Sequence, residues 1–253
     1  MNKKIFEQEI IDWDKNVDFY INENSMPFQE MIRKEIYDFY ELSENDKILE
    51  AGGGAIKINP NTVLMDFSPK MIEFAKSINP PDRKIILGSV HQIPFPDQIF
   101  DAIIVNGTFH HLKAQGLLEE SIKEFYRVLK PNGKICVFDR AYNFIPNFFF
   151  YLRKPIKKIY SPGSQCSTRN ETFFLERDIE EILKRGFRIE KRKYLVPLPL
   201  QLLIISTNVF QYLGGKKLAQ KSQKFLRPLG RVLEKYLAFK PLCAEQCLIF
   251  RKI

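Results

Sequence analysis

Short apolar segments that alternate with helical and turn segments constrain the fold of this chain more than any other feature. Five such segments are four to six residues long, and their apolar residues run almost without polar interruption: 47–50, 62–66, 84–87, 101–106 and 134–139. Strands buried on both faces have this continuous character, and strands that alternate with helices form parallel sheets covered by helices. The sequence therefore predicts an α/β fold with a doubly wound, mostly parallel sheet.

The segments between these strands carry helix signals. Residues 28–40 have apolar side chains at helical spacing, and Ser68 followed by Pro69 is typical of a helix start. The stretch SIKEFYRVLKPNG predicts a helix and its stop signal, and residues 176–186 predict an amphipathic helix that ends at glycine. Two more strands, at 187–196 and 244–251, complete a seven-stranded sheet with a helical insertion before the last strand.

One domain with insertions is the organisation expected for 253 residues. Within it we distinguish an N-terminal helical cap (1–45), a core (46–140), and a part that completes the sheet and adds basic and aromatic insertions (141–253). Residues 1–140 hold 17 Lys and Arg against 22 Asp and Glu, a net charge of −5, whereas residues 141–253 hold 22 against 8, a net charge of +14. The two parts are therefore expected to face different partners.

The N-terminus and the cysteines indicate where the protein resides. The stretch MNKKIFEQEIIDWDKN carries charges every few residues, so it predicts neither a secretory signal nor a membrane span. Cys136, Cys166, Cys243 and Cys247 are widely spaced and form no CxxC pair, and the chain has three histidines. We expect buried, reduced thiols, no metal site and a cytoplasmic protein.

A glycine cluster comes directly after the first predicted strand, in the stretch ILEAGGGAIKI. Glu50 ends the strand, and Gly52, Gly53 and Gly54 interrupt any regular continuation, which lets the backbone approach a ligand closely. The loop also has a purely structural interpretation as a tight turn between two elements. A lone glycine loop is weak evidence, so its interpretation depends on the residues C-terminal to it.

Two further stretches come after the second and third strands. In VLMDFSPKMIEFAK, Asp66 offers two acceptor oxygens at a strand end, which suits the two hydroxyls of a ribose, and Phe67 offers an apolar face to a base. The alternative is that Asp66 starts a helix and Phe67 belongs to the core. The other stretch, GSVHQIPFPDQIFDAIIVNGTFHHL, runs from Gly88 into the strand at 101–106.

Taken together, residues 47–139 resemble the class I S-adenosylmethionine-dependent methyltransferases of the type 11-like group. The resemblance rests on Glu50, Gly52 and Gly54 of the glycine motif, on Asp66, on the IPFPD and FDAIIVN stretches and on FYRVLKPNGKICVFD. It implies S-adenosylmethionine as cofactor and the residues that would bind it: Glu50, Ala51, Gly52, Gly53, Gly54, Asp66, Phe67, Ser89, Val90 and Asn106. Two positions depart from the family: Ile56 stands where a glycine is usual, and Ser89 where an aspartate is usual.

Methyl transfer needs alignment of the acceptor and exclusion of water, and it needs a base only when the acceptor carries a proton. His91, His110 and His111 are expected in loops after the third and fourth strands, near the mouth of the site. His110 and His111 are the candidate general bases, because histidine titrates near neutral pH; the alternative is that these rings only pack over the next helix. His91 is expected beside the adenine pocket.

Other polar residues at strand ends are candidates for the same rim. Asp139, Arg140 and Tyr142 come after the fifth strand and are candidates for the acceptor side. Asn106 closes the fourth strand, and the alternative to its cofactor role is that of a turn residue in its Asn-Gly pair.

The basic part of the chain, residues 141–253, indicates which methyl acceptor the protein uses. Residues 217–235 predict an amphipathic helix with a basic stripe, and the apolar stretch YLVPLPLQLLIISTNVF before it is too short and interrupted to span a bilayer. We expect a hydrophobic or lipid-linked small-molecule acceptor, and an anionic membrane surface as a partner of the basic helix. The alternatives are tRNA or another RNA, which the charge of +14 would suit, and a non-catalytic binding protein, which Ile56 and Ser89 would suit.

Overall fold

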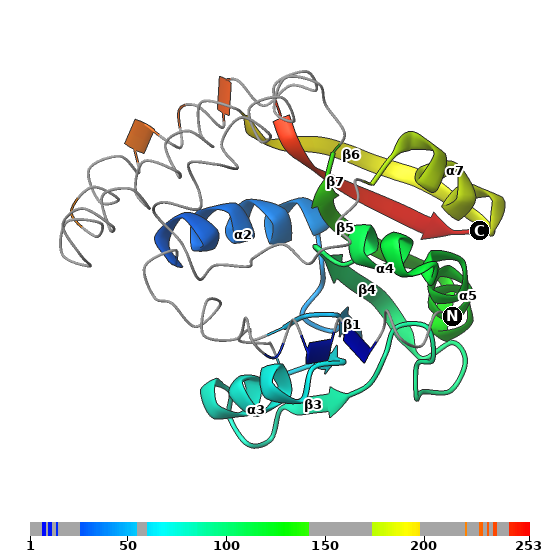
Figure 1. The fold of residues 1–253 in the computed structure, drawn as a ribbon. Helices are drawn as coiled ribbons and strands as arrows, with labels where there is room; N and C mark the ends of the chain where they lie inside the picture. Colours follow the sequence, from blue (N-terminus) through cyan, green and yellow to red (C-terminus); the bar gives the residue numbers. More distant parts are fainter. Residues whose placement is uncertain are drawn as a thin grey trace.

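The structure is a computed structural model that describes residues 26–54, 60–141, 174–197 and 243–253, together with residues 7, 8, 10, 11, 14, 221, 228, 229, 232, 235 and 236. Its helices and strands succeed one another as Figure 1 shows. In chain order they are α2 (Met26–Tyr40), β1 (Ile48–Ala51), β2 (Thr62–Asp66), α3 (Pro69–Ile78), β3 (Lys84–Leu87), β4 (Phe100–Asn106), α4 (Phe109–Gln115), α5 (Leu118–Val128), β5 (Leu129–Arg140), α7 (Glu176–Lys184), β6 (Phe187–Pro197) and β7 (Cys243–Lys252).

The described strands form one seven-stranded sheet in the order β3-β2-β1-β4-β5-β7-β6. The five strands from β3 to β5 pair in parallel, whereas β7 pairs antiparallel with both β5 and β6. The predicted α/β fold with a mostly parallel sheet is therefore confirmed. The division into a cap, a core and a basic part stays a prediction.

The strand and helix predictions hold closely where local signals are strong. Strands β2 and β3 have the predicted bounds, and α3 begins at Pro69 with Ser68 as its N-cap, whose side chain accepts a hydrogen bond from the Met71 N–H. A hydroxyl at this position satisfies one of the backbone donors that a helix start leaves without a partner. Helix α7 is succeeded by Gly186 with φ +89°, as its predicted glycine stop requires.

Two predictions were wrong in detail. His110 and His111 were expected in a loop, but they lie in the first turn of α4. The stop signal after α5 was expected to be a turn that ends before residue 134, but it lies within β5, which begins at Leu129. The register of β5 against β4 shifts between Phe100 and Ala102, so the Lys130–Gly133 segment is accommodated as an irregularity of the strand.

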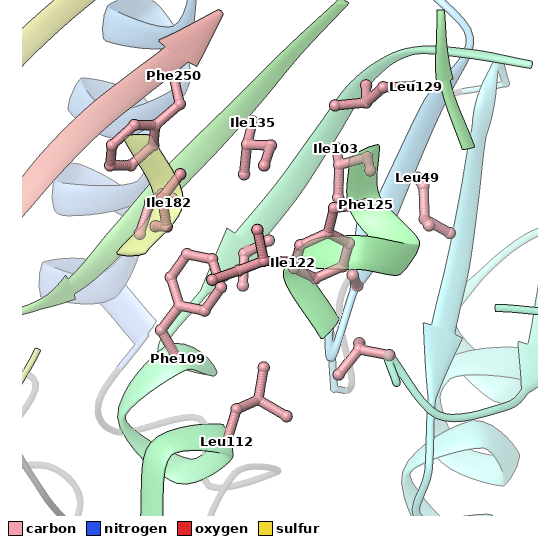
Figure 2. Packing of buried hydrophobic residues seen from close by; sticks show 14 of the residues in the cluster. Leu49, Ile103, Phe109, Leu112, Ile122, Phe125, Leu129, Ile135, Ile182 and Phe250 are labelled. Atoms are coloured by element: carbon pink, nitrogen blue, oxygen red, sulfur yellow. The ribbon is translucent and has the colours of Figure 1, made fainter. Parts of the chain in front are cut away.

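Helices cover both faces of the sheet, which explains why the strands are apolar without alternation. On one face, α2 packs over Ile48, Ile104 and Cys136 through Ile36 and Tyr40. Helix α3 packs beside it over β2. The other face carries α4, α5 and α7, and Figure 2 shows its core, in which the following side chains meet: Leu49, Ile103, Phe109, Leu112, Ile122, Phe125, Leu129, Ile135, Ile182 and Phe250.

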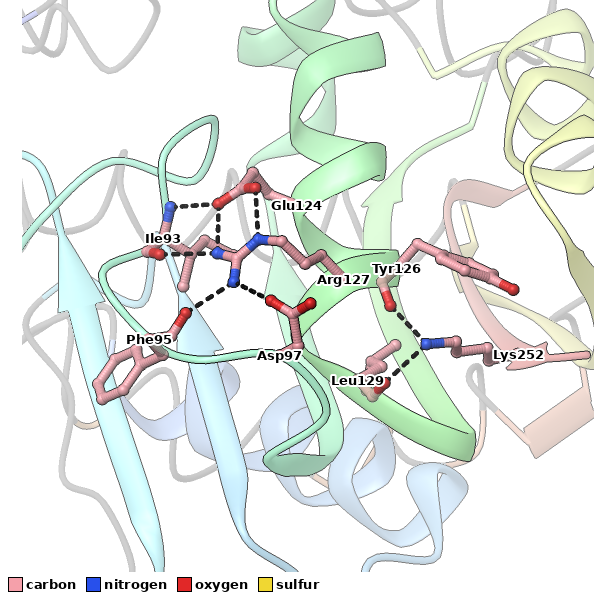
Figure 3. A network of polar contacts seen from close by, with 8 residues as sticks. All are labelled: Ile93, Phe95, Asp97, Glu124, Tyr126, Arg127, Leu129 and Lys252. Carbon is pink, nitrogen blue, oxygen red and sulfur yellow. Dashed lines mark hydrogen bonds and ion pairs between the residues drawn. The ribbon is translucent and has the colours of Figure 1, made fainter.

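Two buried lysines of the sheet form hydrogen bonds to the C-terminal ends of helices. Lys134 Nζ donates to the carbonyl oxygens of Tyr40 (2.8 Å) and Glu41 (2.9 Å) at the end of α2. Lys252 Nζ donates to those of Tyr126 (2.6 Å) and Leu129 (2.8 Å) at the end of α5, as Figure 3 shows. A cation stabilises the carbonyl end of a helix because these oxygens have no partner within it. The burial of Lys252 lowers its pKa.

Several predictions concern residues near or outside the described parts. Cys136, Cys243 and Cys247 are buried, as predicted, and Cys166 lies outside the described residues. Of the predicted basic helix, the described residues are helical and exposed, among them Lys221 and Lys235. Within the described parts of the chain, no helix is both long and apolar enough to cross a membrane.

Candidate functional site

Four polar side chains mark the carboxyl ends of neighbouring strands: Glu50 in β1, Asp66 in β2, Asn106 in β4 and Asp139 in β5. Strand β1 lies between β2 and β4, so the order of the strands reverses at this point of the sheet. In open α/β sheets ligands bind at the carboxyl edge beside such a reversal. The candidate site is therefore built on this edge.

The glycine loop turns sharply at the end of β1. Gly52 and Gly54 have φ values of +69° and +58°, in the left-handed region that favours glycine. A Cβ on Gly52 would lie 2.6 Å from Thr108 Oγ1, so this glycine also permits the close approach of the segment after β4. Ala51 is buried behind the loop. Ile56, the departure noted in the sequence, lies outside the described residues.

Asp66 joins the glycine loop to the start of α3. Its Oδ2 accepts the Gly54 N–H (2.8 Å), and its Oδ1 accepts the Ser68 N–H (2.9 Å). Burial raises the pKa of Asp66, and the hydrogen bonds from Ser68 and Gly54 oppose that rise. Phe67, next to it, is partly exposed. The structural interpretation of Asp66 is therefore confirmed, because its carboxylate bonds to the helix start and to the loop, whereas its contact with a ribose stays a prediction.

Glu50 is almost completely buried and belongs to a network with α2. Its Oε2 accepts the Tyr37 hydroxyl (2.8 Å), and its Oε1 accepts Asn106 Nδ2 (3.3 Å). Asn106 Oδ1 in turn accepts the Tyr40 hydroxyl (2.7 Å). Burial raises the pKa of Glu50 to about 7, while the hydrogen bond from Tyr37 and the charge of Arg33 oppose the rise. At neutral pH this carboxyl is therefore poised between its two protonation states.

The turn after β3 carries Ser89, Val90 and His91. Ser89 Oγ and His91 Nδ1 are 2.6 Å apart, and Val90 is buried. Helix α5 anchors the chain directly beyond this turn, as Figure 3 shows: Glu124 accepts the Ile93 N–H (2.8 Å), and Arg127 donates to the Ile93 carbonyl oxygen (2.9 Å). Arg127 also bonds to the Phe95 carbonyl oxygen and to Asp97 Oδ1, each at 2.8 Å. The IPFPD stretch is thus fixed to the fold.

The histidine pair lies at the ends of β4 and β5. His110 Nδ1 is 2.7 Å from Asp139 Oδ1, and the backbone N–H groups of His110 and Arg140 donate to the same carboxylate. Although burial acts to raise the pKa of Asp139, the charge and hydrogen bond of His110 outweigh it and lower that pKa. The His111 ring packs against His110 with 4.1 Å between centroids. Both histidines are buried.

Some residues of the site were not identified from the sequence. Tyr37 and Tyr40 occupy apolar positions of the predicted helix, yet their hydroxyls reach Glu50 and Asn106. Thr108, whose Oγ1 donates to the Asn106 carbonyl oxygen (3.2 Å), was also missed. Two tyrosines three residues apart lie on one helix face, and that spacing was the available signal. Tyr142 lies outside the described residues.

The arrangement fits the cofactor that the family resemblance implies. A Cβ on Gly54 or Gly107 would meet no atom within 4 Å in the described part of the chain, so the described residues leave the loop and the backbone beside Asn106 uncovered at these two points. Each oxygen of an ionised carboxylate has two acceptor positions. The backbone N–H groups of Gly54, Ser68 and Phe67 bond to the Asp66 carboxylate, and its remaining acceptor position is available to a ribose hydroxyl.

Comparison with known proteins agrees with this fold. Residues 51–137 match the model of the methyltransferase domain family. An uncharacterized methyltransferase of Schizosaccharomyces pombe is 32% identical over 108 residues, which cover 40% of this chain and 41% of that protein. A 2-methyl-6-phytyl-1,4-hydroquinone methyltransferase of Spinacia oleracea is 30% identical over 165 residues, or 61% of this chain and 43% of that protein.

Two other similarities complete the comparison. A probable tRNA methyltransferase 9B of Bos taurus is 32% identical over 88 residues, 34% of this chain and 19% of that protein. The solved structure of a Pyrococcus horikoshii OT3 protein superposes with a TM-score of 0.54 at 13% identity, over 90% of this chain and 92% of that one. The chain spans less than half of the length of each of these curated relatives.

The sheet order and the family match point to one class of protein. Residues 51–137 match the methyltransferase domain family, and the described part of the chain has the α/β fold of solved methyltransferase structures.

Proposed function

We propose that this protein is an S-adenosylmethionine-dependent methyltransferase whose acceptor is a hydrophobic or lipid-linked small molecule. The observation that carries the cofactor part is the pair of buried carboxylates, Glu50 and Asp66, on either side of the glycine loop. When bound, S-adenosylmethionine supplies an electrophilic methyl group. Glu50 and Asn106 would face the ammonium group of its amino acid part, and Asp66 would hold its ribose.

The cofactor contacts are completed by Ala51, the three glycines and the β3 turn. Gly52, Gly53 and Gly54 allow the backbone to approach the ligand, and Phe67 offers an apolar face to the base. Ser89 and Val90 lie in the turn after β3, the strand next to Asp66 on the outer side of the sheet.

His110 is the candidate general base toward a protonated acceptor, and His111 is the second candidate. The 2.7 Å contact with Asp139 holds the His110 ring in one orientation and fixes which nitrogen bonds to the carboxylate. Burial of both rings keeps water away from this end of the site.

The acceptor class is supported by the part of the basic helix that the structure describes. Leu229, Val232 and Tyr236 recur at helical spacing and are 48%, 51% and 67% exposed, with the Lys235 ammonium 5.3 Å from the Tyr236 ring centre. An exposed apolar stripe beside basic residues suits an anionic lipid surface. The similarity to a plant methyltransferase named for a phytyl hydroquinone points to the same class. We propose a cytoplasmic protein that associates with membrane surfaces.

A second candidate is methyl transfer to tRNA. It is favoured by the net charge of +14 over residues 141–253 and by the similarity to a probable tRNA methyltransferase. Phosphate contacts by Lys and Arg would make such binding strongly dependent on salt. A third candidate is a binding protein that retains the fold without the activity.

Calorimetric titration with S-adenosylhomocysteine tests the cofactor site. We expect Asp66→Asn to weaken binding at least tenfold, because the variant offers the ribose one carboxyl oxygen fewer. Asp82→Asn is the matched control, since the Asp82 side chain is 70% exposed and precedes β3, at the opposite end of that strand from the carboxyl ends that form the site. If the unaltered protein does not bind S-adenosylhomocysteine at millimolar concentration, the proposed methyltransferase activity is refuted, and a binding protein that has only the fold becomes the favoured candidate.

Transfer of a radiolabelled methyl group separates the acceptors. A prenylated hydroquinone in anionic vesicles and total tRNA are offered in parallel, at low and raised salt. Label in the hydroquinone supports the lipid-linked acceptor, whereas label in tRNA refutes it and supports the second candidate. Val232→Asp is expected to reduce cosedimentation with the vesicles and to leave affinity for S-adenosylhomocysteine unchanged.

A further inference from the structure

Helix α2 contributes two tyrosine hydroxyls to the carboxyl edge of the sheet. Tyr37 donates to Glu50 Oε2 at 2.8 Å, and Tyr40 donates to Asn106 Oδ1 at 2.7 Å. The Tyr40 side chain is completely buried. Burial raises the pKa of both phenols, so each hydroxyl keeps its hydrogen at neutral pH and can act as a donor.

The Tyr40 hydroxyl determines how the Asn106 amide is oriented. A side-chain amide has an oxygen that accepts on one side and an NH2 group that donates on the other. Because Oδ1 accepts the Tyr40 hydrogen, Nδ2 faces Glu50 and donates to Oε1 at 3.3 Å. The reversed amide would leave the Tyr40 hydrogen without this acceptor and would bring Oδ1 against the Glu50 carboxylate, where two acceptors repel each other.

The Glu50 carboxylate is therefore held at both oxygens from α2. Tyr37 holds Oε2 directly, and Tyr40 holds Oε1 through Asn106. Each oxygen of an ionised carboxylate has two acceptor positions. The hydrogen bonds within the described part of the chain occupy one position on each oxygen and leave the other to a ligand.

Helix α2 is itself fixed to the sheet. Lys134 of β5 donates to the carbonyl oxygens of Tyr40 and Glu41 at the end of the helix. Ile36 and Tyr40 pack into the core over β1 and β4. A support that is locked by packing and by hydrogen bonds holds polar groups in place before a ligand binds. The tyrosine hydroxyls are placed by such a support.

We propose that Tyr37 and Tyr40 are positioning residues: from α2 they fix the Glu50 carboxylate, directly and through Asn106, in the orientation that accepts from the ammonium group of the cofactor. This rests on the proposed function, which takes Glu50 as the partner of that group. The tyrosines act through Glu50 and Asn106 and not by contact with the ligand. Both lie N-terminal to residues 51–137, the part of the chain that matches the family model.

Titration with two ligands tests this role. S-Adenosylhomocysteine carries the amino acid part, and 5′-methylthioadenosine has the same nucleoside without it. We expect Tyr37→Phe and Tyr40→Phe each to weaken binding of S-adenosylhomocysteine about fivefold, the range of one hydrogen bond, and to leave binding of 5′-methylthioadenosine unchanged. Tyr126→Phe is the matched control, because Tyr126 lies near the end of α5 and beside the start of β5, at the opposite edge of the sheet.

The pH dependence of binding separates positioning from a purely structural role. The described groups that interact with the charge of Glu50 are Arg33, Tyr37 and Tyr40 of α2 and Cys136 of β5. Arg33 stays charged, and burial keeps the phenols and the thiol neutral near pH 7, so Glu50, with a pKa of about 7, is the member that ionises there. Affinity for S-adenosylhomocysteine should therefore rise with pH through this value. The Tyr37 hydrogen bond lowers the Glu50 pKa, so Tyr37→Phe should move the rise to higher pH.

The outcomes distinguish this proposal from the proposed function. Equal weakening of both ligands by the two tyrosine variants, or an unchanged affinity for S-adenosylhomocysteine, would overturn the positioning role and leave the cofactor site in place. A rise in affinity at the same pH in Tyr37→Phe and in the unaltered protein would also overturn it. If the unaltered protein binds neither ligand, the proposed function fails and this proposal fails with it.

Discussion

Replacing Glu50 by glutamine should stabilise the fold and weaken the site at the same time. Glu50 is buried at the end of β1, and its pKa is raised from 4.5 to about 7 because burial disfavours the charged form. The unfolded chain loses this proton near pH 4.5, whereas the folded chain keeps it to about pH 7. Stability is therefore full below the unfolded pKa, falls as the pH rises through the folded pKa, and then stays constant.

The size of the effect is set by the two pKa values. A rise from 4.5 to about 7 corresponds to roughly 3 kcal/mol at about 1.4 kcal/mol per pKa unit. Glutamine cannot ionise, so it avoids this penalty, but its amide replaces one oxygen that accepts from Tyr37 or Asn106. The mismatched hydrogen bond costs about 1 kcal/mol. We expect Glu50→Gln to gain about 2 kcal/mol of unfolding free energy at pH 8 relative to the unaltered protein.

Urea unfolding of both proteins between pH 5 and pH 8 measures this difference. The gap should grow with pH over this range, and Glu73→Gln, a change at an exposed position of α3, should show no such growth. The same Glu50 variant should bind S-adenosylmethionine at least tenfold more weakly, since it loses the charge that faces a cation. A gap that is independent of pH would show that Glu50 does not titrate as its burial implies, and the reasoning would be refuted.

Three further changes test the frame of the site, each by urea unfolding at pH 7 unless stated. Gly52→Ala should lose about 1–3 kcal/mol of unfolding free energy. The loss should exceed that of Gly116→Ala, because both glycines have positive φ but only a Cβ on Gly52 would clash with Thr108. Equal losses in the two variants would contradict this clash. Asp139→Asn should lose about 2 kcal/mol of unfolding free energy. The loss should shrink as the pH falls through the lowered pKa of Asp139, since a carboxyl with a lowered pKa stabilises the fold only when it is ionised. A loss that grows toward acid pH would contradict this pH dependence. Lys252→Met should lose about 2 kcal/mol of unfolding free energy, because two carbonyl oxygens at the end of α5 lose their cation. Titration should show unchanged cofactor affinity. Weaker binding would mean that this end of α5 contributes to the site.

The sequence was most informative where a local signal and the tertiary environment agree. The bounds of β2 and β3 were predicted from apolar runs, and the start of α3 was predicted from Ser68 and Pro69, whose effect depends on the backbone within a few residues. The order of these elements then placed Glu50, Asp66 and Asn106 at strand ends, and these ends lie together because the carboxyl ends of parallel strands meet at one edge.

Local signals failed where they were short or weak. Helix α4 has only seven residues, and the side chain of Thr108 at its start makes no capping hydrogen bond in the described part of the chain, so the stretch FHHLKAQ gave little sign of a helix. The start of β5 at Leu129 depends on pairing with Phe100. Because the strand is irregular directly after Leu129, its sequence predicts a turn there.

Periodicity, caps and turn chemistry are properties of neighbouring residues, so the class of fold, the strand-end residues and the glycine positions of the loop could all be read from the chain alone. The partners of those residues could not, because they are distant in the sequence. Tyr37 lies 13 positions from Glu50, Tyr40 lies 66 from Asn106, and His110 lies 29 from Asp139, and each pair meets because strands and helices pack across the sheet. The protonation states and orientations of these side chains depend on that packing. Burial and hydrogen bonds determine both, and they arise between segments that are distant in the sequence.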